Sequence, residues 1–493
     1  MPNPFHPLLY QINTRCLLRE LGPKATLDAV PDALLDRIRD LGFDWIWFLG
    51  VWQTGEAGRR VSRSKQDWRR EWTHVLPDLS EEDITGSPFA VTAYTVHRDF
   101  GGDAALARLR ERLKKRDLHL LLDFVPNHVG LDHPWTQAHP SFFLHGTEAD
   151  LAHEPRNYTR IGNGLILAHG RDPYFDGWPD TLQLNYRHTS LRAAMIQELL
   201  GISDRCDGVR CDMAMLILPD VFQRTWGDRS LPGDGAGPAD DSFWKAAIGC
   251  VRGRRPEFMW MAEAYWDLEW TLQQQGFDYT YDKRLYDRLR AGQGAAVRGH
   301  LQADADHQRR SVRFLENHDE PRAAAVFAPG QHQAAAVITF LVPGLRFFHE
   351  GQLEGRRAHA SMHLGRRPAE PADETLKAFY SRLLEVLKRP EVRSGAWQLC
   401  ACRPAWDGNG TWENFLVFHW ESAADHRLLV VVNFGPAPGQ CYAAVPVPAL
   451  AGQTVRLCDL MSDTQYERHD LPANGLYVDL PAWGFHVFDV TMV

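Results

Sequence analysis

Ionisable side chains stand at the ends of several apolar segments of this chain, where they could act together on a substrate. The set comprises Asp123, Arg210, Asp212, Glu263, His318 and Asp319. Carboxylates that converge beside arginine and histidine can serve as nucleophile, general acid and general base in glycosyl transfer. The same residue types also suit a metal-dependent hydrolase or an aldolase-like enzyme. Taken one at a time, an Asp or His at the end of a strand more often caps a helix or holds a turn, but here such residues follow four strands.

These groups can meet only if the segments that precede them lie side by side. Apolar segments alternate with amphipathic helical segments from the start of the chain to about residue 390. Eight strands are predicted, over residues 7–13, 43–50, 118–124, 207–212, 257–263, 277–282, 311–316 and 344–350. Eight strands that alternate with helices indicate an α/β protein with a (β/α)8 TIM barrel rather than an open sheet. The carboxyl ends of barrel strands form the active-site face, so a barrel would bring the ionisable side chains together.

Two insertions and a change of pattern interrupt this rhythm. The first insertion, about residues 50–91, is charged and rich in tryptophan, and the second follows the third strand. After about residue 392 the chain turns to short alternating segments broken by Gly, Pro and Asn, which predicts antiparallel β structure. We therefore expect three units, which are a catalytic barrel over residues 1–128 and 188–391, an inserted domain over 129–187 and a C-terminal β-sandwich-like domain over 392–493.

Composition and charge exclude several classes of protein. The 493 residues are 44% hydrophobic and 24% charged, as in a globular protein with a large core. A formal net charge of -9 argues against a nucleic-acid partner. No apolar run reaches the ~18 residues of a membrane span, and the N-terminus lacks the features of a signal peptide. We expect a cytoplasmic protein with reduced cysteines and no membrane partner, while the oligomeric state stays open.

Four short segments carry a resemblance to a known family. They are "DFVPNH" (123–128), "GVRCD" (208–212), "MAEAYW" (261–266) and "ENHDE" (316–320). In this order, at the ends of the third, fourth, fifth and seventh predicted strands, they resemble the motifs of the α-amylase family of retaining glycoside hydrolases and transglycosylases. "LQLN" (182–185) resembles the motif near the end of that family's inserted domain B, and the segment 342–355 resembles its eighth strand.

The resemblance implies a role for each of three carboxyl groups. Asp212 would be the nucleophile that forms a covalent β-glycosyl-enzyme, and Glu263 would be the general acid and then the general base. Asp319 would bind ring hydroxyls and favour the distorted sugar. Arg210, two residues before Asp212 on the same strand face, is expected to lower the pKa of Asp212. Partial burial and neighbouring negative charge are expected to raise the pKa of Glu263.

Three further side chains are implied to contact the sugar. His128 and His318 resemble the two histidines that bond hydroxyls of the reacting sugar, with a structural role in the core as the alternative. Tyr94, in the segment 86–102, resembles the tyrosine that stacks beneath that sugar, because an aromatic face can cover the apolar face of a pyranose. A plain core tyrosine is the alternative for Tyr94.

The sequence departs from the family pattern at a few positions that bear on substrate and metal. Met215 and Leu216 replace a Lys-His pair that serves the acceptor side in many relatives, and Ala93 replaces an Asp found in enzymes that recognise a terminal glucose. Asn127 occupies a position that helps to bind calcium in many amylases, but its other ligands cannot be placed. We therefore expect no cofactor and no metal, with calcium as the alternative.

The resulting hypothesis is a retaining α-glycosidase that hydrolyses a small α-glucoside or oligosaccharide rather than polymeric starch. One alternative is a transglycosylase or phosphorylase of the same family that passes glucose to a sugar, a polyol or phosphate. Another is a catalytically silent homologue that binds sugar or regulates a partner.

Two segments outside the motifs have open interpretations. Trp68 and Trp72, four residues apart, are expected to pack inward from a helix. The alternative is a rim on which Arg69 and Arg70 contact an anionic or glycosylated aglycone. The segment 170–180 is dense in Asp and aromatic residues and suits either a sugar-contacting edge or a compact loop.

Overall fold

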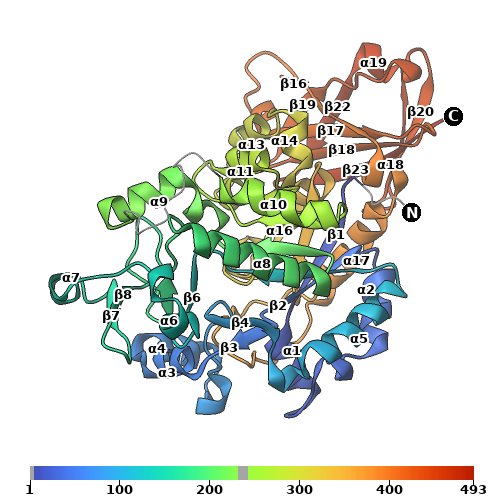
Figure 1. The fold of residues 1–493 in the computed structure, drawn as a ribbon. Coiled ribbons are helices and arrows are strands. Elements are labelled where there is room, and N and C mark those ends of the chain that lie inside the picture. Colours follow the sequence, from blue (N-terminus) through green and yellow to red (C-terminus); the bar gives the residue numbers. More distant parts are fainter. Residues whose placement is uncertain (1–4, 231–241) are drawn as a thin grey trace.

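The computed structural model describes residues 5–230 and 242–493, and a closed barrel of eight parallel strands lies at its centre (Figure 1). The strands are β1 (Leu8–Asn13), β2 (Trp45–Leu49), β5 (His119–Phe124), β10 (Gly208–Cys211), β11 (Met259–Ala262), β12 (Tyr279–Tyr281), β13 (Ser311–Arg313) and β14 (Leu345–His349). Around the barrel they follow one another in chain order, and β14 pairs with β1 to close it. The predicted (β/α)8 barrel and its eight strands are confirmed.

Helices cover the outside of the barrel, so its strands are buried on both faces and read as continuous apolar runs. These helices include α2 (Asp32–Asp40), α5 (Gly102–Lys114), α8 (Thr189–Arg205), α10 (Phe243–Arg254), α12 (Lys283–Arg290), α16 (Pro329–Leu341) and α17 (Glu374–Leu387). In α5, Leu106, Leu109 and Leu113 recur at intervals of three and four residues and are all buried. That spacing puts them on one face of the helix, against the barrel.

The strand register brings the predicted catalytic segments to one edge of the barrel. Arg210 on β10 lies between Asp123 on β5 and Met261 on β11 in the parallel ladder. The ladder continues past the strands, because the Asp212 N–H donates to the carbonyl of Phe124 (2.8 Å) and the Glu263 N–H donates to the carbonyl of Cys211 (3.0 Å). Asp212 and Glu263 therefore leave neighbouring strands at the same end.

Two insertions border that end of the barrel. Between β2 and β5 the chain forms β3 (Trp52–Thr54), α3 (Glu56–Ser64), α4 (Gln66–Val75) and β4 (Val91–Val96). Between β5 and β10 it forms the antiparallel pairs β6 (His128–Gly130) with β9 (Thr181–Gln183) and β7 (Tyr158–Arg160) with β8 (Ile166–Ala168). Figure 1 places both insertions on the side of the barrel away from the C-terminal strands.

The C-terminal part is built from two antiparallel sheets, as the sequence pattern predicted. One holds β15 (Ala396–Cys400), β17 (Phe415–Glu421), β18 (Arg427–Asn433), β23 (Phe485–Met492), β20 (Thr454–Asp459) and β21 (Gln465–His469), and the other holds β16 (Cys402–Arg403), β19 (Gly439–Ala443) and β22 (Leu476–Leu480). Side chains from both sheets share one apolar core. Trp420 on β17 donates its indole N–H to the carbonyl of Leu341 at the end of α16 (2.7 Å), which ties this part to the barrel.

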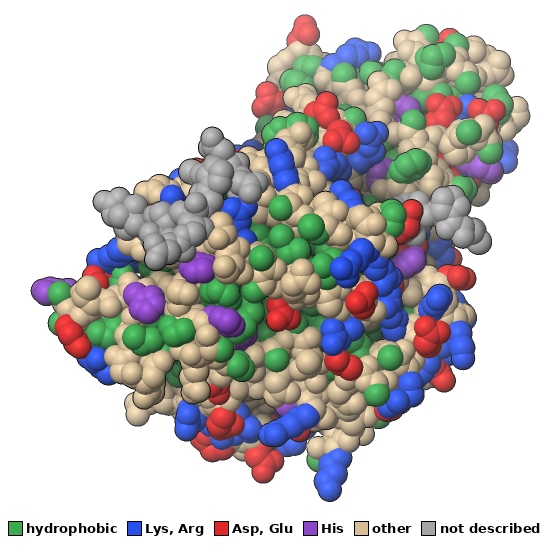
Figure 2. Space-filling model, in the orientation of Figure 1, with side chains coloured by type: hydrophobic (Ala, Val, Ile, Leu, Met, Phe, Trp, Pro, Cys, Tyr) green, Lys and Arg blue, Asp and Glu red, His purple; other side chains and the backbone are tan. Residues whose placement is uncertain are grey.

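The surface carries charges of both signs. Figure 2 shows Lys and Arg interspersed with Asp and Glu over the face drawn. Many of these charges are paired across neighbouring helices, as between Arg112 and Asp32 (2.9 Å) and between Arg205 and Asp103 (2.8 Å). Over residues 5–230 and 242–493, no helix combines the length and the apolar character needed to cross a membrane.

Candidate active site

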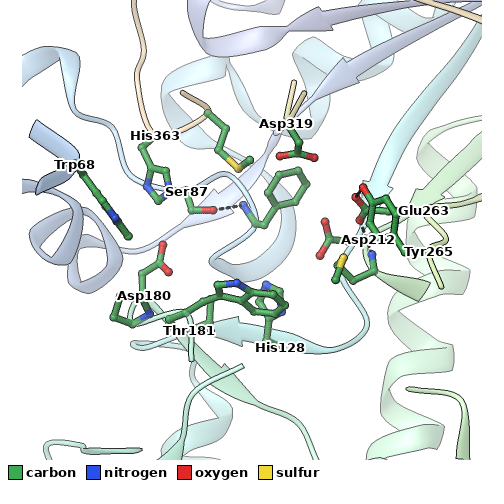
Figure 3. Close-up of a pocket in the computed structure, with 15 residues that line it drawn as sticks. Trp68, Ser87, His128, Asp180, Thr181, Asp212, Glu263, Tyr265, Asp319 and His363 are labelled. Atoms are coloured by element: carbon green, nitrogen blue, oxygen red, sulfur yellow. Dashed lines mark hydrogen bonds between the residues drawn. The ribbon is translucent and has the colours of Figure 1, made fainter. Parts of the chain in front are cut away.

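A fully buried arginine lies at the centre of the ionisable cluster. The guanidinium of Arg210 pairs with Asp212 through Nη1 and with Glu263 through Nη2, the latter at 2.8 Å. Asp212, Glu263 and Asp319 all line one cavity of about 310 Å³ at the end of the barrel (Figure 3). The barrel thus brings together the three carboxyl groups that the sequence pointed to. Arg210 itself is covered, so it acts on the cavity through the carboxylates that it holds.

Glu263 is held by three donors. The backbone N–H of Met213 donates to Oε2 (2.7 Å), and the hydroxyl of Tyr265 donates to Oε1 (2.9 Å). Arg210 contacts the same Oε2. Met213 adopts the left-handed backbone conformation (φ 41°), which is uncommon for residues other than glycine. Such strained backbone conformations cluster at active sites and ligand-binding sites. Here it turns the N–H that follows Asp212 toward Glu263.

Burial raises the pKa of both carboxyl groups beside Arg210. Burial raises the pKa of Glu263 to about 7, with Arg210 opposing the shift and the charges of Asp212 and Asp319 adding to it. The expectation of a raised pKa for Glu263 is confirmed. Burial also raises the pKa of Asp212, and the opposing effect of Arg210 is the smaller one. Arg210 therefore lowers the pKa of Asp212, as expected, but burial outweighs it and the net shift is upward.

His318 is set in one tautomer by the residue behind it. The amide of Gln11 donates to Nδ1 (2.9 Å), so the ring proton lies on Nε2, which is 3.1 Å from Oδ2 of Asp319. Burial lowers the pKa of His318 well below its usual range, with Arg210 adding to the effect, and the ring is neutral. Asp319 is oriented from the other side by Asn317, whose Oδ1 accepts the N–H of Asp319 (2.8 Å).

The other acidic residues of the segment 316–320 are structural. Glu316 is buried and accepts from Arg322 (2.7 Å) and from the N–H of Ala323 (2.7 Å). Glu320 pairs with Lys283 (3.2 Å). These contacts hold in place the turn that carries His318 and Asp319.

His128, which begins β6, lines the cavity, whereas Asp123, near the end of β5, does not. His128 is buried and lies against the ring of Trp178, with the centroids 5.1 Å apart. Burial lowers the pKa of His128 to about 3. Asp123 accepts from the indole N–H of Trp47 (3.0 Å) and from the N–H of Gly50 (2.7 Å), so it joins the ends of β2 and β5. It has a structural role.

The structure corrects the role predicted for Tyr94. Its ring is buried away from the cavity, and its hydroxyl donates to the carbonyl of Val125 (3.0 Å) and accepts from the N–H of Val125 (2.9 Å). The aromatic ring at the cavity floor is Phe89, whose centroid lies 5.2 Å from the guanidinium carbon of Arg210 and 5.5 Å from the ring of His318. Ala93 was compared with the family through its position before Tyr94, so its identity no longer bears on the recognition of a terminal glucose.

Tyr94→Phe tests this correction. We expect a loss of about 1–3 kcal/mol in the free energy of unfolding, because the substitution leaves a buried N–H and a buried carbonyl of Val125 without partners. Thermal and denaturant unfolding measure the loss, and Tyr477→Phe, at an exposed tyrosine of β22, is the matched control. A phenylalanine ring can lie beneath a sugar as well as a tyrosine ring can. An unchanged free energy of unfolding in Tyr94→Phe would therefore contradict the structural role and favour the sugar-binding role for Tyr94.

Several residues that line the cavity were not predicted from the sequence. They are Ser87, Phe89, Trp178, Pro179, Asp180, Thr181, Met213, Tyr265, Met362 and His363. The dense segment 170–180 contained a signal for three of them, and its interpretation as a sugar-contacting edge is the one that the cavity supports. Trp72 packs inward with Leu76 and Leu364, as expected, whereas Trp68 lines the cavity.

The residues around Asn127 do not fit a calcium ion. The side-chain oxygen of Asn127 accepts from the amide of Gln183 (2.9 Å), and the same amide also contacts the carbonyl of Asn127 (3.0 Å). A nitrogen donor thus lies where a cation would need oxygen ligands. Within residues 5–230 and 242–493 no cluster of three His, Cys, Asp or Glu side chains has the arrangement of a metal site.

Three arginines of the first insertion, Arg63, Arg69 and Arg70, are paired with acids on the surface. Arg69 pairs with Glu81 (2.5 Å), as does Arg63 (3.5 Å), and Arg70 pairs with Asp67. Their charges are balanced locally, which weighs against a rim built to hold an anionic group.

The barrel, the insertion after its third strand and the carboxyl groups around Arg210 form an arrangement that suits the cleavage or transfer of glycosyl groups. Residues 32–382 match the family model of the alpha amylase catalytic domain. The chain therefore belongs to the α-amylase family.

Its relatives are distant. The chain is 24% identical over 445 residues to alpha-amylase MalA of Haloarcula japonica, a match that covers 87% of this chain and 56% of MalA, so the chain spans about half the length of that relative. Over 172 residues it is 30% identical to an alpha-1,4-glucan:maltose-1-phosphate maltosyltransferase of Burkholderia pseudomallei, which covers 33% of this chain and 14% of that protein.

Solved structures share the fold. A maltogenic alpha-amylase AmyB of Thermotoga neapolitana superposes with a TM-score of 0.71 at 17% identity, over 99% of each chain. An alpha-amylase of Geobacillus thermoleovorans in complex with acarbose gives a TM-score of 0.67 at 17% identity, over 100% of this chain and 99% of that one.

Proposed function

We propose that this protein is a retaining α-glycosidase that hydrolyses a small α-glucoside through a covalent β-glycosyl ester on Asp212. The observation that carries the proposal is the pair of carboxyl groups, Asp212 and Glu263, held by one buried guanidinium at the wall of the cavity. Burial keeps a proton available on Glu263 near neutral pH, which a general acid requires.

The proposed reaction has two steps that use the same two groups. Asp212 attacks the anomeric carbon while Glu263 gives its proton to the leaving oxygen, so the bond to the aglycone breaks and an ester bond to Asp212 forms. Water then gives a proton to Glu263 and attacks the same carbon, which releases the sugar with its original configuration and restores both carboxyl groups. His318 and Asp319 would hold ring hydroxyls, and Phe89 would lie under the ring.

The preference for a small substrate is supported by the residues that follow Asp212. Met215 and Leu216 are buried, so neither offers a polar group to an acceptor sugar. The cavity volume, about 310 Å³, falls at the lower end of the roughly 300–1,000 Å³ usual for small-molecule sites.

Transfer to an acceptor other than water is the second candidate. The match to the maltosyltransferase of Burkholderia pseudomallei favours it, because that relative is named for passing maltose between glucan and phosphate. The covalent intermediate would be the same, and only the group that attacks it would differ. Among the described residues, no arginine or lysine lines the cavity and His318 is neutral, so the cavity lacks a cationic group for phosphate, which favours water or a sugar as acceptor.

Product analysis by NMR separates these outcomes. We expect an α-glucosyl substrate to give first the α-anomer of glucose, because two inversions at the same carbon restore the configuration. The reaction is followed with water alone and with added sugar, polyol or phosphate, and each acceptor is scored by mass spectrometry. A β-anomer as first product would contradict the retaining mechanism, and exclusive appearance of a glucosyl-acceptor or glucose phosphate would favour transfer.

A further inference from the structure

A second cavity, of about 320 Å³, lies between α1 (Thr14–Leu21) and the first insertion, and we call it the α1 cavity. Its other walls are β3, the start of α3 and the segments 82–85 and 97–100, and Figure 1 shows α1, β3 and α3 together at the bottom of the view. None of its described lining residues belongs to the cavity of the candidate active site. Four arginines and three acids line the α1 cavity, and Arg15 is the most buried of them.

Arg15 is a buried cation without an acid beside it. It is only 7% exposed, and it forms no ion pair within the described parts of the chain. Its Nη1 donates to the hydroxyl of Thr85 (3.2 Å) and to the carbonyl of Gly86, and its Nη2 donates to the hydroxyl of Thr54 (3.1 Å). A guanidinium has five N–H donors, so one on Nε and one on Nη2 have no partner among the described residues. Burial lowers the pKa of Arg15 to about 10, as expected for a cation that no acid stabilises.

The other buried arginines of the described chain show what Arg15 lacks. Four of them pair with a carboxylate, namely Arg210, Arg313, Arg322 and Arg427. The fifth, Arg346, donates from each of its three nitrogens to a backbone carbonyl. Arg15 has neither a carboxylate nor a bond from every nitrogen, whereas buried charges are normally both paired and hydrogen-bonded. An anion in the α1 cavity would supply what is missing.

The acids of the α1 cavity do not fill this role, because each of them faces another arginine. The three pairs are Glu82 with Arg19 (3.5 Å), Glu56 with Arg59 (3.8 Å) and Asp99 with Arg98 (3.7 Å). All are longer than the 2.7 Å pair of Arg108 with Asp28 on the same side of the barrel, so these arginines are held loosely. The cavity therefore has one positive charge in excess, and that charge is the buried one.

His97 adds a further donor to the α1 cavity. The N–H of Asp99 donates to its Nδ1 (3.2 Å), so the proton of the neutral ring lies on Nε2. Burial lowers the pKa of His97 to about 4, with the charge of Arg15 adding to the effect, and the ring is neutral at physiological pH. The cavity thus offers N–H donors from two side chains beside an uncompensated positive charge.

We propose that Arg15 and His97 form a binding site for a small oxyanion, a phosphate or carboxylate group, with Arg59 at its edge. Both groups present two oxygens to the fork of a guanidinium, whereas a neutral sugar would leave the charge uncompensated. The volume exceeds that of the group alone, so the ligand is a small organic molecule that carries it. The site does not depend on the reaction proposed at Asp212.

Calorimetric titration of the full chain at neutral pH tests the site. Sodium phosphate is added in one arm, sodium acetate in a second and sodium chloride in a third, at equal ionic strength. We expect phosphate or acetate to bind at one site per chain and at least tenfold more tightly than chloride, because only an oxyanion offers two oxygens to the guanidinium. Tighter binding of phosphate identifies a phosphate group as the ligand, and tighter binding of acetate identifies a carboxylate. The proposal is overturned if neither binds or if chloride binds as tightly.

Substitutions of arginine place the binding in the α1 cavity. Arg15→Gln is expected to weaken binding of the preferred anion at least tenfold, since it removes the buried charge. Arg59→Gln is expected to weaken it at least threefold and covers the case in which Arg15→Gln fails to fold, because Arg59 is partly exposed. Arg60→Gln is the matched control, since Arg60 is the next residue of α3 but is exposed and does not line the cavity. Binding by Arg59→Gln within twofold of the unsubstituted protein, or an equal loss in Arg60→Gln, contradicts the proposal.

A crystal soaked in sodium tungstate locates the anion directly, because tungstate is a tetrahedral oxyanion with strong anomalous scattering. We expect an anomalous peak within hydrogen-bond distance of Arg15 and His97. A peak found only beside Asp212 in the active-site cavity would overturn the site at Arg15 and would instead favour transfer to phosphate at the active site. The absence of any peak in the α1 cavity leads to the same rejection, and it leaves the proposed hydrolysis untouched.

Discussion

Asp212→Asn is expected to lower kcat/KM on α-glucosyl fluoride by about 10⁴-fold or more. Loss of a nucleophile removes the covalent route altogether, and comparable substitutions in enzymes that form covalent intermediates have effects of this order or larger. The asparagine side chain keeps the shape of the carboxyl group and can still face Arg210, so the cavity is expected to persist. Fluoride is a leaving group that needs little help from an acid, so the measurement isolates the attack by Asp212.

A rescue experiment distinguishes the nucleophile from a residue that only shapes the cavity. In Asp212→Gly, added azide is expected to take the place of the carboxylate and give a β-glucosyl azide, because it enters from the same face of the sugar. Asp278→Asn is the matched control, since Asp278 is also a carboxylate paired with an arginine, Arg252 (2.6 Å), but precedes β12 at the opposite end of the barrel. Full turnover by Asp212→Asn would mean that another group forms the bond to the sugar.

The fold could be predicted from the sequence because each barrel strand is a continuous apolar segment. Trp45–Leu49 and Leu345–His349, for example, are buried along their whole length, and such runs between amphipathic helices have few other solutions. Asp212 and Glu263 could be located for the same reason. Asp212 and Glu263 directly follow β10 and β11, so the position of each strand fixes the position of the side chain, whereas Asp319 lies further beyond the end of β13 and was indicated by its family motif.

The rest of the site depended on contacts between distant segments, which a linear pattern does not contain. The sequence does not show whether the ring of Tyr94 or that of Phe89 faces the cavity. In the structure the hydroxyl of Tyr94 donates to the carbonyl of Val125, and Phe89 lines the cavity instead. Asp180 and His363 line the same cavity although they belong to distant segments of the chain. The net shift of the pKa of Asp212 likewise depends on how deeply the barrel buries it, which spacing along β10 cannot reveal.

Glu263→Gln is expected to give a loss that depends on the leaving group. For a disaccharide, whose leaving oxygen must be protonated, kcat/KM should fall by about 10²–10⁴-fold, the usual contribution of a general acid. For α-glucosyl fluoride the first step should lose far less. The substitution should be tolerated, because the amide oxygen can accept from Met213 and Arg210 while its NH₂ group faces the hydroxyl of Tyr265, which can turn to accept. Comparison of the two substrates on one preparation gives the result.

The pH profile gives an independent measure of the same residue. Because the pKa of Glu263 is raised to about 7, the acid is protonated below that pH, and kcat/KM on the disaccharide should fall as pH rises through about 7. Glu263→Gln should lack this alkaline limb. Glu269→Gln is the matched control, since burial raises the pKa of Glu269 to about 7 as well, yet it lines a different hollow with Trp270 and His307. If the alkaline limb disappears in Glu269→Gln and persists in Glu263→Gln, then Glu263 is not the general acid. An equal loss of kcat/KM on α-glucosyl fluoride and on the disaccharide in Glu263→Gln would lead to the same conclusion.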